Sequence, residues 1–288
     1  MCTSEPERAS RAARAEPSAR PSVRFLDRTL ARRLEACDGA CAVAHVRARR
    51  ALEPLFTGDV LAVAGGWAVH SGPGSPINFA VGIGLDGPVG ESQFASIERF
   101  FEARAAAPSF KLCPLADPTL WALLRARGYA PVAFLSAWVR ELADAPDQPR
   151  PPGVRIEAVT AAREAVWAET VTCGFSGRRP PTDADRAFLA GFWASPGTTA
   201  FLLTCDGVPA AAGALFVHAG VGMLFNAATL PAHRGHGYQQ LLIAHRLQAA
   251  RRLGADLAFV QAAPGDASAR NIERSGFRLA YTKLLVER

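Results

Sequence analysis

The sequence lacks an apolar run of the roughly 20 residues that a membrane-spanning helix requires. Its first residues, MCTSEPERASRAARAEPSARPS, also lack an apolar stretch, so we expect no secretory signal peptide. Charged residues make up 20% and hydrophobic residues 49%, which excludes a largely disordered chain, a collagen and a simple coiled coil. The 288 residues therefore predict a globular protein of about two domains with no membrane partner, and a cytoplasmic location is the default expectation.

Cysteine pairs at the spacing of metal ligands are missing. The 6 cysteines include no C-x-x-C pair, and no spacing between cysteine and histidine matches a zinc site. We expect no metal, and we interpret the cysteines as buried free thiols in a reducing compartment.

Lysine is nearly absent, because Lys111 and Lys283 are the only lysines among 32 basic residues. We interpret this mainly as a coding bias towards arginine. The net charge of +6 is concentrated at the start of the chain, where the first 50 residues hold 11 basic and 6 acidic residues and the remainder holds 21 and 20. A nearly neutral bulk argues against a broad phosphate-binding face, so nucleic acid is not an expected partner.

A proline-rich segment, residues 144–153, divides the chain into two nearly equal halves. It holds four prolines and little that could pack, so we expect an extended, exposed linker. The arginine-, alanine- and proline-rich start predicts a disordered tail over residues 1–22. The remaining ranges are then a first domain, 23–143, and a second domain, 154–288.

The two halves end alike. Each closes with a short arginine-containing helix that stops at a glycine, followed by an aromatic residue and an apolar strand; the pairs are Gly128-Tyr129 and Gly276-Phe277. We interpret the halves as two copies of one α/β unit. The alternative is two unrelated domains that share a common ending.

Hydrophobic periodicity in the second half predicts a mixed α/β sheet with the element order βααβββαβαβ. Thr182 is a plausible N-cap, and Asp206-Gly207 predicts a hairpin turn. The predicted strands cover residues 154–159, 198–205, 208–219, 221–229 and 256–263 before the last one. The predicted helices cover 161–172, 183–193 and 238–253, with a short helix before the last strand.

A glycine loop follows the predicted strand 221–229. Pro231 prevents the strand from continuing, and Gly235 and Gly237 allow a tight turn and a close approach of backbone to a ligand. The free N–H groups at the start of the next helix, together with Arg234, would form a cradle for a pyrophosphate. The alternative is a simple turn between a strand and a helix.

With this loop, the second half resembles the GCN5-related N-acetyltransferase (GNAT) superfamily of acyl-CoA-dependent acyltransferases. The superfamily motif is R/Q-x-x-G-x-G/A, and Arg234, Gly237 and Gln239 occupy its three fixed places, with Gln239 departing from the usual Gly or Ala. The resemblance covers Val154 to Arg288. In the first half LDGPVGESQ stands where the loop should be, so that half looks like a degenerate copy in a tandem arrangement.

The resemblance implies acetyl-CoA as co-substrate and a primary amine, of unknown identity, that attacks the thioester directly. The pantetheine arm would lie where the fourth strand splays from the fifth. Asn271 would cap its short helix, which is the preferred interpretation, or contact that arm. The implied cofactor-binding residues are Ala228, Thr229, Leu230, Arg234, Gly235, His236, Gly237, Tyr238, Gln239 and Asn271.

The catalytic residues remain unknown at this stage. Many members have a tyrosine acid four residues before the Gly-Phe pair, where this chain has Ile272, and strand 221–229 carries no Asp or Glu. Two hypotheses therefore stay open: an N-acetyltransferase with one active domain, and a non-catalytic sensor or scaffold that binds acyl-CoA. The remaining candidates for acid or base are His218, His233, Tyr281 and Cys173.

Overall fold

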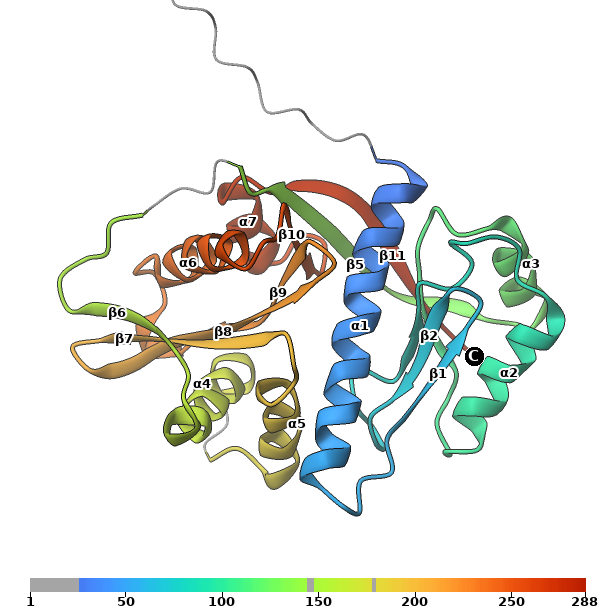
Figure 1. Ribbon diagram of the computed structural model, residues 1–288, viewed down its shortest axis with the longest axis horizontal. Coiled ribbons are helices and arrows are strands. Elements are labelled where there is room, and N and C mark those ends of the chain that lie inside the picture. The colour runs from blue at the N-terminus through green and yellow to red at the C-terminus, as the bar shows by residue number, and fades with distance from the viewer. Residues whose placement is uncertain (1–25, 144–147, 178–179) are drawn as a thin grey trace, which may run out of the picture.

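The computed structural model describes residues 26–143, 148–177 and 180–288, which form one mixed sheet of 11 strands with helices on both faces (Figure 1). The predicted tail, 1–22, and residues 144–147 of the predicted linker lie outside the described residues. The strands are β1 Asp59–Val63, β2 Gly66–His70, β3 Phe79–Val81, β4 Ser109–Leu112, β5 Ala130–Glu141, β6 Val154–Ala158, β7 Thr198–Cys205, β8 Val208–His218, β9 Val221–Thr229, β10 Leu257–Ala262 and β11 Arg278–Glu287. The helices are α1 Arg28–Leu52, α2 Glu91–Glu102, α3 Pro118–Ala126, α4 Glu164–Ser176, α5 Asp183–Trp193, α6 Tyr238–Arg252 and α7 Ala267–Arg274.

The fold class predicted from the sequence is confirmed. The second half runs βααβββαβαβ from β6 to β11, and the bounds of β7, β9 and α5 are those predicted. The largest shift is in α4, where a 3₁₀ turn over Ala161–Arg163 precedes the α-helix. The predicted N-cap Thr182 forms a capping box with Asp185, which fixes the start of α5.

The two halves follow the same order of elements over their last seven members. In each, three strands are followed by a helix, a strand, a second helix and a last strand, from β1 to β5 and from β7 to β11. In each, the third and fourth strands of this series are parallel, β3 with β4 and β9 with β10. This agreement favours two copies of one unit over two unrelated domains.

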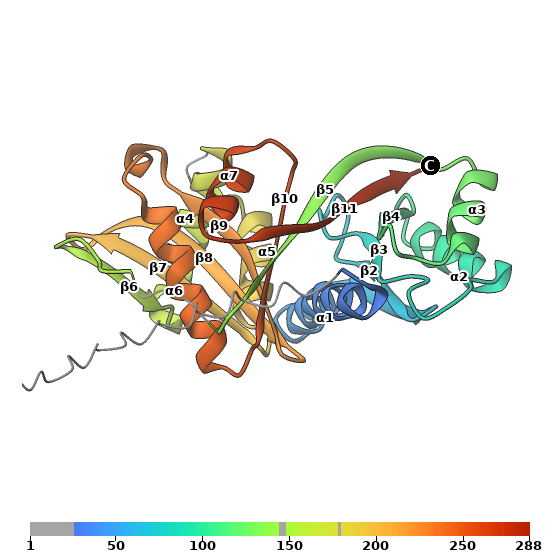
Figure 2. The ribbon, with the colours of Figure 1, turned by 90° about the horizontal axis from the view of Figure 1, so that it is seen from above.

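The last strands of the two halves are exchanged in the sheet. The strand order is β1-β2-β3-β4-β11-β5-β10-β9-β8-β7-β6, so β5 lies between β10 and β11, and β11 lies between β4 and β5. Figure 2 shows β5 and β11 running together between the two halves. The strand ladder therefore crosses from one half of the sequence to the other without an interruption.

Helix α1 fills the space between the halves and contacts β2, β9 and α5 (Figure 1). Asp27 caps it by accepting a hydrogen bond from the Leu30 amide at 2.8 Å. Its apolar side includes Leu34 and the fully buried Cys37, which join a core shared with β9, β10 and β11. As predicted, the described cysteines are free, and all but Cys205 are buried.

No helix in the described ranges is both long and apolar enough to cross a membrane. Within the same ranges, no three His, Cys, Asp or Glu side chains are grouped as metal ligands would be.

Candidate active site

A gap between β9 and β10 forms the larger part of the site. The two parallel strands are paired from Val221 with Leu257 to Leu224 with Val260, and there the pairing stops. Beyond that point β9 stays paired with β8, whereas β10 stays paired with β5. The strands therefore splay, as the sequence comparison with the GNAT superfamily implied, and a cavity of about 980 Å³ opens between them.

A β-bulge lies in β9 at the point of splaying. The register between β8 and β9 slips between Ala212 and Ala214, so that Asn226 and its neighbour Ala227 face the single residue Gly213. Asn226 has φ of 45°, in the left-handed region that asparagine tolerates better than most residues. A bulge leaves ladder groups unpaired, and here it does so at the wall of the cavity.

Arg246 on α6 supports this bulge from inside the protein. Its Nη1 donates to the carbonyls of Ala214 at 3.2 Å and Phe225 at 3.4 Å, and its Nε donates to Leu242 O at 3.1 Å. Burial lowers the pKa of Arg246 to about 9, which still leaves a cation at neutral pH. Arg246 also lines the cavity, so a positive charge lies in its wall.

The predicted phosphate cradle is open. Gly235 and Gly237 have φ of 83° and 73°, and a Cβ at either position would meet nothing within 4 Å. Helix α6 begins with no side-chain cap and no acidic residue in its first turn, so its first N–H groups and the positive end of its dipole face outward. Arg234 is held beside the loop, where its Nη2 donates to Gly174 O at 3.0 Å.

Most of the residues implied by the resemblance line this one cavity. Leu230 lines a neighbouring pocket instead, and its amide is bonded to Ala210 O. His236 is exposed and does not line the cavity; its Nδ1 lies 3.0 Å from Arg234 O, and its ring stacks on that of Tyr238. The residues that do line the cavity are Ala228, Thr229, Arg234, Gly235, Gly237, Tyr238, Gln239 and Asn271.

The role preferred for Asn271 from the sequence, capping its short helix, is wrong. Asp266 is the N-cap of α7 and accepts a hydrogen bond from Ala269 N at 2.6 Å. Asp266 takes this place because it directly precedes the helix, whereas Asn271 lies inside it. Asn271 instead borders the cavity.

The walls of the cavity hold buried polar atoms without partners in the described structure. They are Nδ2 of Asn226 and the Oε1 atoms of Gln239 and Gln261. Buried polar groups are nearly always hydrogen-bonded in folded proteins. The three atoms therefore fit a polar ligand, such as the amide-rich arm of a coenzyme, and those of Asn226 and Gln261 lie outside the glycine loop.

Of the four candidate acids and bases, only His233 lines the cavity. His218 lies at the far end of β8, and Cys173 is buried in α4. The Tyr281 hydroxyl donates to Glu35 Oε1 at 2.6 Å, and burial raises the pKa of that phenol well above its usual range. Ile272 does line the cavity, so the position where many superfamily members have a tyrosine hydroxyl carries an apolar side chain in this protein.

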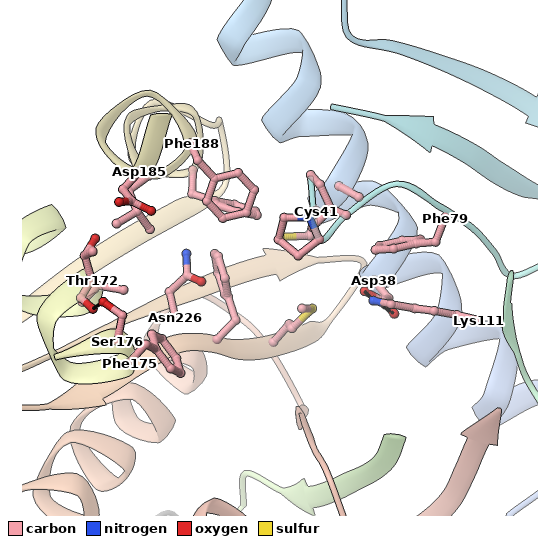
Figure 3. A pocket seen from close by; sticks show the side chains of 18 residues that line it. Asp38, Cys41, Phe79, Lys111, Thr172, Phe175, Ser176, Asp185, Phe188 and Asn226 are labelled. Atoms are coloured by element: carbon pink, nitrogen blue, oxygen red, sulfur yellow. Dashed lines mark hydrogen bonds and ion pairs between the residues drawn. The ribbon is translucent and has the colours of Figure 1, made fainter. Parts of the chain in front are cut away.

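A second cavity, of about 520 Å³, meets the first at β9 (Figure 3). It lies between the two halves, with walls from α1, the loop before β3, β4, α4, α5 and β9. The two cavities share Phe175, Met223, Phe225 and Asn226. A ligand in one can therefore approach a ligand in the other beside the bulge.

Sequence reasoning missed Asn226, Arg246 and the whole second cavity. Arg246 gave a signal, because it stands on the apolar side of a helix one turn after Leu242, where a charge is costly. Asn226 gave none, since nothing local marks a bulge in an apolar strand. The second cavity depends on contacts between distant segments.

Residues 133–266 match the family model of the acetyltransferase (GNAT) domain. No curated protein matches the sequence significantly. Among solved structures, a GCN5-related N-acetyltransferase from Kribbella flavida is 22% identical over 86% of this chain and 95% of its own, with a TM-score of 0.62. One from Sphaerobacter thermophilus is 16% identical over 92% and 94%, with a TM-score of 0.56. A tandem GNAT protein from the clavulanic acid biosynthesis pathway is 15% identical over 92% and 96%, with a TM-score of 0.55. These likenesses establish the fold.

Proposed function

Since the chain belongs to the GNAT superfamily, we propose that it is an acetyl-CoA-dependent N-acetyltransferase that moves an acetyl group to a primary amine by direct attack. The observation that carries the proposal is the meeting of two cavities at the splayed end of β9. One has an open anion cradle and unpartnered polar atoms, and the other is mostly apolar. A coenzyme and an acceptor need this arrangement to react without a covalent enzyme intermediate.

Each part of the first cavity has a task in this proposal. The N–H groups of the glycine loop and Arg234 bind the pyrophosphate, and Gln261 and Asn271 offer hydrogen bonds to the pantetheine arm. Acetyl-CoA supplies the thioester. The donors at the bulge, including Asn226 Nδ2, lie where negative charge would develop on the acetyl oxygen.

The proton transfers need little from the chain. Thiols ionise near pH 8.5, at about the pKa of a free cysteine, so a thiolate leaves without a strong acid. His233 is the one titratable candidate at the cavity and can exchange protons with water at its edge. We propose that water carries the proton from the amine.

The first half has a supporting role in this proposal. The segment between β3 and α2 lacks the paired R-G-H-G glycines, and Gly90 caps α2 in an extended conformation. The first half instead contributes walls to the acceptor cavity, including Phe79 and Lys111. We therefore propose a tandem arrangement in which residues 154–288 bind the coenzyme and residues 23–143 shape the acceptor site.

Replacing Gly237 by valine is expected to weaken acetyl-CoA binding by at least about tenfold. A β-branched residue is strained at φ of 73°, and its side chain would enter the open cradle. The stabilising shift in Tm that acetyl-CoA gives to the wild type should shrink accordingly.

Gly254→Val is the matched control. Gly254 lies just after the other end of α6, has φ of 84°, and also has open space around it. The substitution therefore introduces a similar backbone strain at a position that does not line the cavity. Its Tm should fall while the shift caused by acetyl-CoA persists. An unchanged shift in Gly237→Val would place the coenzyme elsewhere.

The sensor alternative rests on Ile272, and a pair of variants tests it. Ile272→Tyr places a phenol at the wall of the cavity, and Ile272→Phe places the same ring without the hydroxyl. If the domain is an enzyme, the Tyr variant should release free thiol from acetyl-CoA at least severalfold faster than the Phe variant, because a general acid assists the leaving group. The measurement is release of free thiol over a panel of amines.

Wild-type turnover is the reference in that assay. We expect it to be measurable but modest. Binding of acetyl-CoA with no amine-dependent release from wild type or either variant would favour the non-catalytic sensor.

A further inference from the structure

Both lysines of the chain meet at one carboxylate beside the second cavity. Lys283 on β11 places Nζ 2.9 Å from Asp38 Oδ2 and 2.9 Å from Glu35 Oε1, both on α1. Lys111 on β4 places Nζ 3.3 Å from both oxygens of Asp38. The other 30 of the 32 Lys and Arg residues are arginines. A coding bias towards arginine does not explain why the two exceptions lie next to the same carboxylate.

The two lysines differ in the number of carboxylates that their ammonium groups contact and in the distances of these contacts. Lys283 is fully buried and bonded to two carboxylates at short distance. Among the described residues, Lys111 contacts Asp38, at the longer distance of 3.3 Å, and the ring of Phe79 at 3.7 Å. The Lys111 side chain is 12% exposed and lines the cavity, and Figure 3 shows it running beside Phe79 with its nitrogen next to Asp38. Burial lowers the pKa of Lys111 although Asp38 opposes this, so the ammonium is incompletely compensated.

Asp38 itself has no capacity left for a ligand cation. It already faces two ammonium groups, which outweigh its burial and hold its pKa well below its usual range. A substrate ammonium brought to this end would meet the charges of Lys111 and Lys283. A substrate carboxylate would meet the open N–H of Lys111.

The other end of the second cavity carries a carboxylate and hydroxyl groups and no lysine. There Asn226 marks the junction with the first cavity, and Asp185, Thr172 and Ser176 lie at the same side in Figure 3. An ammonium is tolerated near a carboxylate and hydroxyl groups, and this end is where the thioester would lie. The rest of the lining is largely apolar and aromatic, and includes Cys41, Leu189, Phe192, Met223 and Phe225.

We infer that the ligand of the second cavity is an amine with an apolar, ring-sized body that carries a carboxylate at its far end, where Lys111 binds it. This inference rests on the proposed function, because it names the acceptor class of the same site. The cavity volume of about 520 Å³ lies in the range of small-molecule pockets. An α-amine of an amino acid does not fit as the acceptor, since that amine and the carboxylate are attached to the same carbon.

Two probes of the same shape test the inference in the full chain: 4-(aminomethyl)benzoate and 4-(aminomethyl)benzamide, which keeps the amine and replaces the carboxylate with a neutral amide. Calorimetry should show the benzoate binding about tenfold more tightly to the wild type, as a charge-assisted hydrogen bond allows. Lys111→Met should reduce this ratio to about one, and Lys111→Gln should do the same if the Met variant does not fold. Arg33→Met removes a partly exposed cation of α1, bonded to Asp256, and should leave the ratio unchanged.

Binding and turnover are measured separately, so the two proposals fail differently. Equal binding of the two probes, no binding of either, or a carboxylate preference that survives both Lys111 variants would overturn the inference. A preference that depends on Lys111 supports the ligand class even without thiol release. In that last case the acetyltransferase proposal fails and the sensor remains.

Discussion

Residues 154–288, expressed without the first half, are expected to remain unfolded or to aggregate. The cut removes β5, which pairs with β10 from Leu257 to Ala262 and with β11 along nearly its whole length. Both partner strands would then present unpaired N–H and C=O groups and apolar side chains to water, and such edges promote aggregation. Circular dichroism and size-exclusion chromatography on the fragment test this expectation.

Co-expression of residues 1–143 with residues 154–288 is the matched control, because it removes only the linker. The two fragments should assemble and recover acetyl-CoA binding, since β5 and β11 can still pair across the cut. An isolated second half that unfolds cooperatively, with the Tm of the intact chain, would show that the exchanged strands are dispensable.

The elements that the sequence predicted well are those with local signals. The capping box at Thr182 and the Asp-Gly turn after Cys205 fix ends within a few residues of chain, so α5 and β7 were placed correctly. The phosphate cradle was predicted for the same reason, since a glycine with a positive φ before a helix is a local requirement.

The exchange of β5 and β11 carried no such signal. Either strand reads as an apolar run that could pair with any neighbour, and the choice is made by contacts about 150 residues apart in the chain, as between Ala137 and Tyr281. The same is true of the second cavity. Its polar end joins Asp38 to Lys111, two residues that no sequence motif connects.

The sparse lysines show how composition can mislead. Taken as a coding bias, Lys111 and Lys283 carried no structural information. In the folded chain they converge on Asp38, because a compact ammonium fits between buried carboxylates where the larger planar guanidinium of arginine would need more room.

Lys283→Met is expected to lower the free energy of unfolding by about 3–5 kcal/mol, because removing one partner of a buried ion pair leaves a charge uncompensated. Lys283 is fully buried and joins the last strand of the chain to α1 through Glu35 and Asp38. Unfolding in urea, followed by circular dichroism, measures the loss.

Arg33→Ala is the control for this loss, because it also breaks an ion pair between α1 and the second half. The pair of Arg33 with Asp256 is partly exposed, so it should contribute about 1 kcal/mol or less. Equal effects of the two variants would show that burial of the Lys283 pair has no energetic consequence.

The difference between wild type and Lys283→Met should narrow as the pH falls below about 4, near the usual pKa of an aspartate. In the wild type the two lysines hold the pKa of Asp38 well below its usual range, against the effect of burial, so this carboxylate stays ionised and its contribution persists above the unfolded pKa. In the variant, burial is opposed only by Lys111 and a hydrogen bond from Gln261, so the folded protein takes up a proton at higher pH and the cost of the lost ion pair is relieved. Urea midpoints at pH 7 and at about pH 3 test this directly, and a difference that stays constant between them would exclude Asp38 as the group whose protonation relieves the loss.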